Sequence, residues 1–154
     1  MPSQRKLDEL YLDIAERVSQ MSHGRRLKVG AVVTKGRNII SYGWNGMPAG
    51  MDNNCEIENA DGTLSTRPEV VHAEDNALRK LQEANTDGQL DGATLYCTDS
   101  PCPHCADLYI DSKIARVVYR KQYRLLDGVE RCRACGIEVE HIPGESDDSK
   151  PASA

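Results

Sequence analysis

The first twenty or so residues carry a helical pattern of hydrophobic and polar positions. Apolar side chains recur every three or four residues, with charged residues between them: Leu7, Leu10, Tyr11, Ile14, Val18 and Met21. This spacing predicts an amphipathic helix over residues 5–21, whose apolar face lies against a sheet.

Two apolar runs follow and predict an antiparallel hairpin. They span residues 29–33 and 38–43, and the turn-prone pair Lys35-Gly36 lies between them. The next segment, residues 44–67, is rich in Gly, Asn, Asp and Pro and has no sustained period. We predict a long loop there, and loops of that length are usually functional or disordered.

The rest of the chain alternates helical and strand-forming segments. We expect helices over residues 69–84, 100–112 and 125–134, and strands over residues 94–97, 114–120 and 137–142. Ser100 and Pro101 supply the N-cap and first-turn proline of the second of these helices, and Gly136 closes the third. The alternation favours an α/β fold with a largely parallel sheet covered on both faces, and with the opening hairpin as its antiparallel edge.

Length and composition limit the organisation of the chain and its partners. The 154 residues suffice for one core, so we expect a single domain over residues 1–142 and a disordered polar tail over residues 143–154. No apolar run approaches the roughly 18 residues of a membrane span, and the first residues lead into no signal-peptide stretch. We therefore expect a cytoplasmic protein without a membrane partner. The net charge of -5 also disfavours a nucleic-acid partner.

Cysteines bring the first candidate chemistry. Without a secretory signal, two Cys-x-x-Cys pairs more often indicate metal binding or redox chemistry than disulfides. One pair lies in Pro-Cys-Pro-His-Cys at residues 101–105, and His-Ala-Glu lies at residues 72–74; both are at predicted helix starts. His72, Cys102 and Cys105 offer three zinc ligands and leave the fourth tetrahedral position for water, which indicates catalysis. Zinc lowers the pKa of its bound water to about 7.

Glu74 follows His72 by two residues. On a helix it would project about 200° away from that ligand, so it need not bind the same ion and is free to move protons. Either motif alone is weak, because a Cys-x-x-Cys pair is often structural and a histidine at a helix start is often a cap. Both together predict a catalytic zinc site.

A rival site would use four thiolates, those of Cys102, Cys105, Cys132 and Cys135. Such a site is closed, so the protein would be a noncatalytic zinc-ribbon module. It would leave His72 without a role. We therefore expect free thiols at the second pair, one of them buried in a helix face, and the alternatives are a second metal or a disulfide.

Beyond these motifs, residues 28–141 resemble the deoxycytidylate (dCMP) deaminases of the cytidine deaminase superfamily, in the bacterial and phage style. The matching stretches are Val-Gly-Ala-Val-Val at 29–33, Gly-Trp-Asn-Gly-Met-Pro-Ala-Gly at 43–50, Asp-Asn-Asn-Cys-Glu at 52–56 and Pro-Glu-Val-Val-His-Ala-Glu-Asp-Asn-Ala at 68–77. The resemblance implies an α/β/α sandwich with a five-stranded mixed sheet, and the hydrolysis of dCMP to dUMP and ammonia for thymidylate supply. It also implies a homo-oligomer, commonly a hexamer, that dCTP activates and dTTP inhibits.

The resemblance also assigns roles in the site. In zinc nucleobase deaminases with this signature, the His and both Cys hold Zn²⁺ and the Glu is the general acid/base. Carried over, Glu74 takes a proton from water and gives it to the ring N3, hydroxide attacks C4, and the amino group leaves as ammonia.

The expected substrate-binding residues are Asn45, Ala73, Arg26 and Tyr123. Asn45 resembles the residue that holds the sugar hydroxyl, and the alternative is a turn asparagine. Arg26 lies where the family places phosphate contacts, and it is a stronger candidate than Arg25. The alternative is a solvated strand edge. Tyr123 would stack on the nucleotide or hydrogen-bond it, unless it only packs.

Other groups keep open alternatives. Some relatives carry an extra structural zinc near Cys55, which His23 or His104 could join; the alternative for these side chains is solvent exposure. A basic cluster is interpreted as surface, with a subunit boundary or an effector phosphate as the alternative: Arg116, Arg120, Lys121 and Arg124.

Two rival activities share parts of this pattern. A tRNA adenosine deaminase has the same Gly-Trp-Asn, His-Ala-Glu and Pro-Cys-x-x-Cys, but the acidic charge and the insertion at 51–68 argue against it. Acceptance of dCTP as a second substrate stays open, because the phosphate contacts are the least specific part of the pattern.

Overall fold

The computed structural model describes residues 2–84, 87–123 and 125–144. Most of the tail expected from residue 143 therefore lies outside the described residues. The elements are α1 (Gln4–Ser19), β1 (Gly30–Lys35), β2 (Asn38–Trp44), β3 (Glu56–Glu58), β4 (Leu64–Thr66), α2 (Ala73–Glu83), a 3₁₀ turn (Asp87–Leu90), β5 (Thr94–Asp99), α3 (Pro103–Asp111), β6 (Arg116–Lys121), α4 (Asp127–Ala134) and β7 (Glu138–His141).

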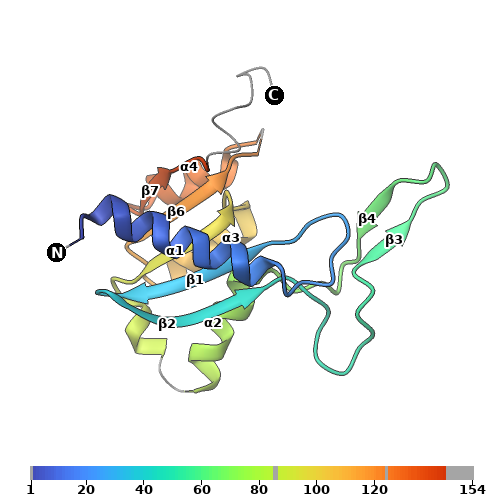
Figure 1. The fold of residues 1–154 in the computed structure, drawn as a ribbon, viewed down its shortest axis with the longest axis horizontal. Helices are drawn as coiled ribbons and strands as arrows, with labels where there is room; N and C mark the ends of the chain where they lie inside the picture. Colours follow the sequence, from blue (N-terminus) through green and yellow to red (C-terminus); the bar gives the residue numbers. More distant parts are fainter. Residues whose placement is uncertain (1, 85–86, 124, 145–154) are drawn as a thin grey trace.

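Five strands form the central sheet, in the order β2-β1-β5-β6-β7 (Figure 1). β1 runs antiparallel to both β2 and β5, whereas β5, β6 and β7 are parallel. The antiparallel part is thus larger than the hairpin edge that the sequence predicts. The mixed five-stranded sheet itself is confirmed.

The helices cover both faces of this sheet, because alternate residues of each strand point to opposite sides. On one face, Val32, Tyr96 and Val118 pack against α1. On the other, Ala31, Val33, Leu95 and Cys97 pack with buried residues of α2, α3 and α4. The expected three-layer α/β/α arrangement is confirmed.

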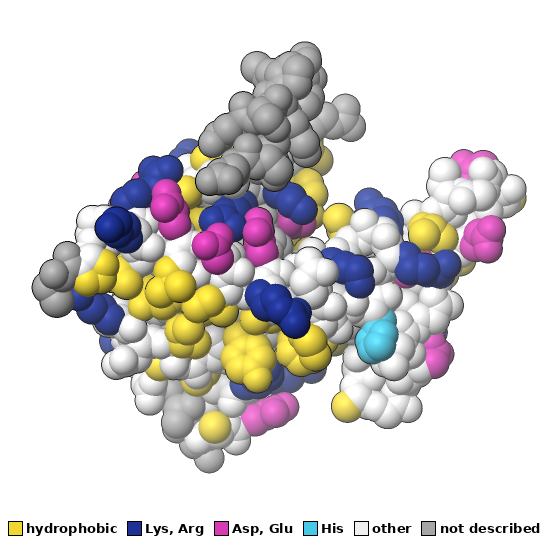
Figure 2. Space-filling view, viewed as in Figure 1, with side chains coloured by type: hydrophobic (Ala, Val, Ile, Leu, Met, Phe, Trp, Pro, Cys, Tyr) yellow, Lys and Arg dark blue, Asp and Glu magenta, His cyan; other side chains and the backbone are white. Residues whose placement is uncertain are grey.

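The buried face of α1 differs from the one that the hydrophobic pattern predicts. Leu10 and Met21 are 48% and 53% exposed, whereas Leu12, Ala15 and Ser19 are buried. Small side chains let the helix lie close to β1: a Cβ added to Gly30 would come within 2.0 Å of the Ala15 carbonyl oxygen. The displaced apolar side chains leave hydrophobic surface around α1 and β2 (Figure 2).

A buried ion-pair network also fixes α1. The Asp8 carboxylate is 2% exposed and accepts hydrogen bonds from Arg116 Nη1 at 2.7 Å, Arg116 Nη2 at 2.8 Å and the Tyr96 hydroxyl at 2.6 Å. Arg120 of β6 is 7% exposed and pairs with Asp13 and Glu16 of α1.

The surface interpretation of the basic cluster is therefore wrong for two of its three arginines, Arg116 and Arg120, which form ion pairs with carboxylates of α1. Lys121 is exposed, as expected, and Arg124 lies outside the described residues.

The segment 44–67 is not a loop throughout. It carries the β3–β4 hairpin, which projects from the body of the molecule (Figure 1). After it, a bridge between Gly46 and Val71 holds the chain extended, so α2 begins four residues later than predicted, at Ala73.

α3 begins at Pro103, with Cys102 in place of Ser100 as the N-cap.

Among the described residues, no helix combines the length and the apolar character that crossing a bilayer requires.

The Asp8–Arg116 pair gives a stability prediction. The hydrogen bonds and the charge of Arg116 outweigh the burial of Asp8, and the pKa of this carboxyl is below its usual value. Its stabilisation is present above the unfolded-state pKa, near 4, and is lost as the pH falls through the lower folded-state pKa. We expect Asp8→Asn to lower the free energy of unfolding by about 3 kcal/mol at pH 7.

Urea unfolding monitored by circular dichroism measures this difference. It should shrink as the pH falls through the lowered folded-state pKa of Asp8, where the wild-type carboxyl itself becomes protonated. A difference that stays constant down to acid pH would show that charge pairing is not its source.

Candidate active site

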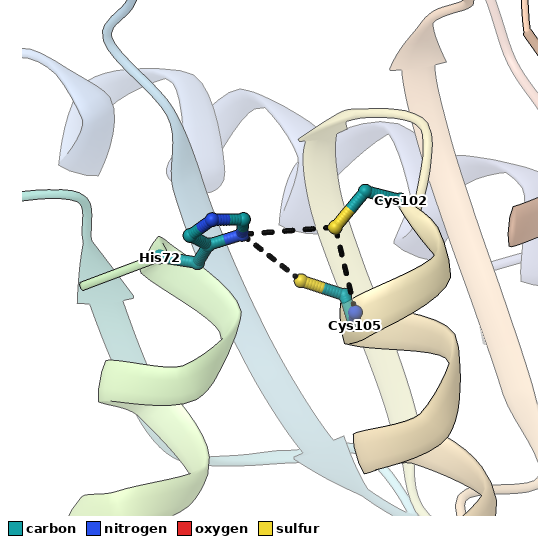
Figure 3. A group of neighbouring side chains, drawn as sticks. All are labelled: His72, Cys102 and Cys105. Carbon is teal, nitrogen blue, oxygen red and sulfur yellow. Dashed lines mark hydrogen bonds between the residues drawn. The ribbon is translucent and has the colours of Figure 1, made fainter. Parts of the chain in front are cut away.

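Two helix starts bring the three predicted metal ligands together. His72 is the N-cap of α2, Cys102 is the N-cap of α3, and Cys105 lies in the first turn of α3. Pro103, between the two cysteines, suits the first helical turn because its missing N–H has no intrahelical role there. Figure 3 shows the imidazole directed at both sulfur atoms.

The spacing of the ligand atoms suits zinc. His72 Nδ1 lies 3.3 Å from Cys105 Sγ and 3.7 Å from Cys102 Sγ. Bonds of about 2.0–2.1 Å to nitrogen and about 2.3 Å to sulfur, at a tetrahedral angle, separate N and S by about 3.6 Å. The three side chains therefore fit a zinc ion, and they form the one such cluster in the described part of the chain.

The start of α3 stabilises an anionic sulfur at Cys102. Hydrogen bonds from the Cys105 thiol, from His72 and from the Cys105 backbone N–H, the last at 3.4 Å, lower the pKa of the Cys102 thiol to about 3. A helix N-terminus favours negative charge for the same reason. The start of α3 thus favours the thiolate form that a metal ligand needs.

Glu74 lies beside this cluster and is not part of it. Its side chain is 5% exposed, and burial raises the pKa of its carboxyl above the usual value, against an opposing hydrogen bond with Cys105. A raised pKa makes this carboxyl a better proton acceptor than one in water, which suits a general acid/base.

His72 and Cys102 of the cluster line a pocket of about 280 Å³ together with Glu74. All four expected substrate-binding residues line it, together with residues that sequence analysis did not single out. The full lining is Arg26, Leu27, Val29, Asn45, Thr66, Val70, His72, Ala73, Glu74, Asp99, Ser100, Cys102 and Tyr123.

Asn45 is buried and already engaged with the backbone. Its Oδ1 accepts from the Val29 N–H at 2.9 Å, and its Nδ2 donates to the Leu27 carbonyl at 3.0 Å. The side chain thus shapes the pocket wall at residues 27–29. Each amide atom can make one more hydrogen bond, so a ligand hydroxyl can also be held.

Glu56 is a buried glutamate that sequence analysis did not single out, and its contacts place the two candidate arginines differently. Glu56 Oε2 accepts from the backbone N–H groups of Arg25 and Arg26, at 2.9 and 3.0 Å. The Arg25 guanidinium turns back to Glu56 Oε1, at 3.4 Å, whereas Arg26 lines the pocket and reaches Thr66 Oγ1 at 3.4 Å. Of the two, Arg26 is placed to meet a ligand.

Tyr123 closes another side of the pocket. Its hydroxyl donates to Asp99 Oδ2 at 2.5 Å, and its backbone N–H donates to Ser100 Oγ at 3.1 Å. Burial and the Asp99 carboxylate raise the pKa of the phenol. Asp99 Oδ1 is buried and has no hydrogen-bond partner within the described part of the chain.

Position in the fold was the one signal for Asp99 and Ser100. Asp99 is the last residue of β5 and Ser100 follows it, and ligands of open α/β sheets bind beyond the carboxyl ends of parallel strands.

The remaining cysteines stay apart from this cluster. Cys132 is fully buried in the core between α4 and its neighbours, and Cys135 is exposed. The four-thiolate site is thus not formed among the described residues. Cys55 is buried, and no second group of metal ligands accompanies it in that part of the chain.

Comparison with known proteins agrees with this geometry. The deoxycytidylate deaminase of Mycobacterium phage D29 is 42% identical over 125 residues, which cover 75% of this chain and 94% of that relative. The deoxycytidylate deaminase of Enterobacteria phage T4 is 33% identical over an alignment of 171 positions, covering 86% of this chain and 88% of that relative.

A solved structure is similar as well. The dCMP deaminase of the cyanophage S-TIM5, crystallised with dCMP and dUMP, superimposes with a TM-score of 0.82 at 41% identity, covering 92% of this chain and all of that one. The family model described as the cytidine and deoxycytidylate deaminase zinc-binding region matches residues 5–121, which include all three ligands and Glu74. The chain therefore belongs to the cytidine and deoxycytidylate deaminase family.

Proposed function

We propose that this protein is a zinc-dependent dCMP deaminase, carried by a single domain over residues 1–142. It hydrolyses dCMP to dUMP and ammonia and so supplies the dTMP precursor. The observation that carries the proposal is the His72, Cys102 and Cys105 cluster beside the buried Glu74, in a pocket that also holds Arg26. The two phage relatives and the S-TIM5 enzyme support the choice of dCMP.

The chemistry divides between the metal and one carboxyl. His72, Cys102 and Cys105 would hold a zinc ion, which would supply a water molecule with a pKa low enough for attack at neutral pH. Glu74 accepts a proton from the attacking water and delivers it to the ring N3. After attack at C4, the C4–N bond breaks and the amino group takes up the second water proton, so that dCMP and water become dUMP and ammonia.

The pocket walls position the nucleotide. Ala73, buried between His72 and Glu74, lies against the base, and Asn45 holds the sugar hydroxyl with its remaining hydrogen-bonding capacity. Arg26 binds the 5′-phosphate, for which a guanidinium is well suited. Tyr123, held by Asp99, forms the wall that packs on or hydrogen-bonds the nucleotide.

Regulation and assembly belong to the same proposal. We infer a homo-hexamer that dCTP activates and dTTP inhibits. A second pocket of about 330 Å³ is lined in part by Trp44, Arg79 and Lys80, with Glu83 as its acidic residue, and the excess of positive charge supports binding of an anionic effector. The hydrophobic surface around α1 and β2 (Figure 2) supports self-association.

A cytoplasmic site of action, in the host if a phage encodes the chain, fits the viral relatives. A tRNA adenosine deaminase is the weaker candidate, since the net charge of -5 gives no basic face for a polynucleotide.

The ligand set predicts which substitutions separate metal from turnover. We expect about one zinc per chain in the wild type and almost none in Cys102→Ser, because one imidazole and one thiolate hold the ion weakly. Glu74→Gln should keep its zinc and lose activity by about 10³-fold, within the usual range for a general acid/base. Plasma mass spectrometry and an ammonia assay provide the two readouts.

Cys132→Ser is the matched control, since it removes a thiol of the other Cys-x-x-Cys pair. It should retain zinc. Zinc lost from Cys132→Ser and kept in Glu74→Gln and Cys102→Ser alike would contradict the proposed ligand set.

Substrate choice is tested by ammonia release from dCMP, CMP, deoxycytidine, dCTP and a tRNA anticodon stem, each with and without added dCTP or dTTP. We expect the highest kcat/KM with dCMP, raised by dCTP and lowered by dTTP. Comparable turnover of dCTP would add a second substrate. Activity on the tRNA alone would refute dCMP as substrate while sparing the zinc chemistry.

The two neighbouring arginines test the phosphate contact. Arg26→Ala should raise KM for dCMP about 10-fold or more, because a charge-assisted hydrogen bond contributes roughly 1.5–3 kcal/mol. Turnover of deoxycytidine, which has no phosphate, should stay unchanged. Arg25→Ala is the control, since its guanidinium faces Glu56, and should change KM less than about 3-fold. Equal losses on both substrates would exclude a phosphate role for Arg26.

A further inference from the structure

Gly43 lets β2 pack directly against the helix that begins after His72. A Cβ added at this position would lie 2.6 Å from the Ala73 carbonyl oxygen and 2.7 Å from the Ala77 amide nitrogen. Its φ lies outside the left-handed region, so the requirement is for space and not for backbone freedom. Gly43 belongs to the Gly-Trp-Asn-Gly stretch and has no role in the proposed function.

Gly128 allows equally close packing against the segment that carries Cys102. It lies in the first turn of α4, and an added Cβ would lie 2.0 Å from the Pro101 carbonyl oxygen and 2.7 Å from the Cys102 carbonyl carbon. α4 therefore rests on the peptide that leads into the first thiolate ligand. No motif of the sequence points to this glycine.

Both close contacts are between main-chain atoms, and neighbouring hydrogen bonds or ion pairs hold the packed elements together. Around Gly43, Ser41 Oγ donates to the Ala77 carbonyl at 2.7 Å, and Asn76 Nδ2 donates to the Trp44 carbonyl at 2.8 Å. Around Gly128, Arg131 of α4 pairs with Asp107 of α3 at 3.0 Å, and Cys132 is buried one turn further on. An added methyl group must therefore displace main chain, because neither contact ends on a flexible side chain.

The displacement is large compared with what a zinc site tolerates. Cβ contacts under 3.0 Å essentially never occur, so Gly128→Ala must shift the Pro101–Cys102 segment or α4 by about 1 Å, and Gly43→Ala must shift α2 or β2 by about 0.4 Å. Zinc–ligand distances hold to within about 0.2 Å. His72 lies on one side of the cluster and Cys102 on the other, so a shift of α2 or of the Pro101–Cys102 segment changes their separation, whereas a shift confined to β2 or α4 does not.

We propose that Gly43 and Gly128 are positioning residues of the metal site, which set the separation between the His72 imidazole and the two thiolates. The proposal rests on the zinc site of the proposed function. It assigns a role in zinc affinity to two residues that touch neither metal nor substrate.

The test measures zinc affinity by competition with a chromophoric chelator, well below the unfolding midpoint of every variant. We expect Gly128→Ala to weaken zinc binding about 10- to 100-fold and Gly43→Ala by a smaller factor, as for other groups that orient metal ligands. The visible absorption of the Co²⁺-substituted protein should change in band position or intensity, which a loss of stability alone would not cause.

Two other glycines are matched controls. Gly30→Ala creates an equally severe clash, 2.0 Å from the Ala15 carbonyl oxygen, on the opposite face of the sheet. It should lower the unfolding midpoint and leave zinc affinity and the Co²⁺ spectrum unchanged. Gly46→Ala, in the same stretch as Gly43, has open space and should match the wild type in zinc affinity.

The outcomes are distinct. Zinc affinity that is unchanged in both test variants, or that falls as much in Gly30→Ala, overturns the proposal, while a wild type that binds no zinc overturns the proposed function. If Gly128→Ala does not fold, the milder Gly43→Ala decides. Failure of both to fold assigns these glycines to the fold and contradicts the proposal.

Discussion

The meeting of two helix N-termini beside the carboxyl end of β5 is the constraint on which the site depends. α2 brings His72 as its N-cap, and α3 brings Cys102 as its N-cap and Cys105 in its first turn. Unpaired backbone N–H groups and the positive end of the helix dipole favour anions at such positions. The local fold thus lowers the cost of holding two thiolates close together, a task that a loop without these donors would perform poorly.

The same helix start separates the metal ligand from the acid/base. His72 and Glu74 are two residues apart on α2, and the carboxyl is buried beside Cys105 at the edge of the pocket. Burial raises the pKa of this carboxyl, because the charged form loses its hydration. Position and proton affinity therefore come from one structural cause, the packing of the first turn of α2 against the sheet.

Much of this arrangement could be predicted from the sequence, and the failures have physical reasons. Strong periodicity and two short motifs gave the order of the main elements and the ligand cluster, because both signals are local. The buried face of α1 could not be predicted: Ala15 and Ser19 are buried because they permit close contact with Gly30, which depends on the partner strand. Asp99 and Glu56 were missed for the same reason, since only the fold brings their carboxylates to Tyr123 and to the segment before β1.

X-ray absorption at the zinc edge of the purified protein tests the central claim most directly. The account predicts one nitrogen at about 2.0–2.1 Å, two sulfurs at about 2.3 Å and one further light atom from solvent. A shell of four sulfurs, or a shell without sulfur, would contradict it.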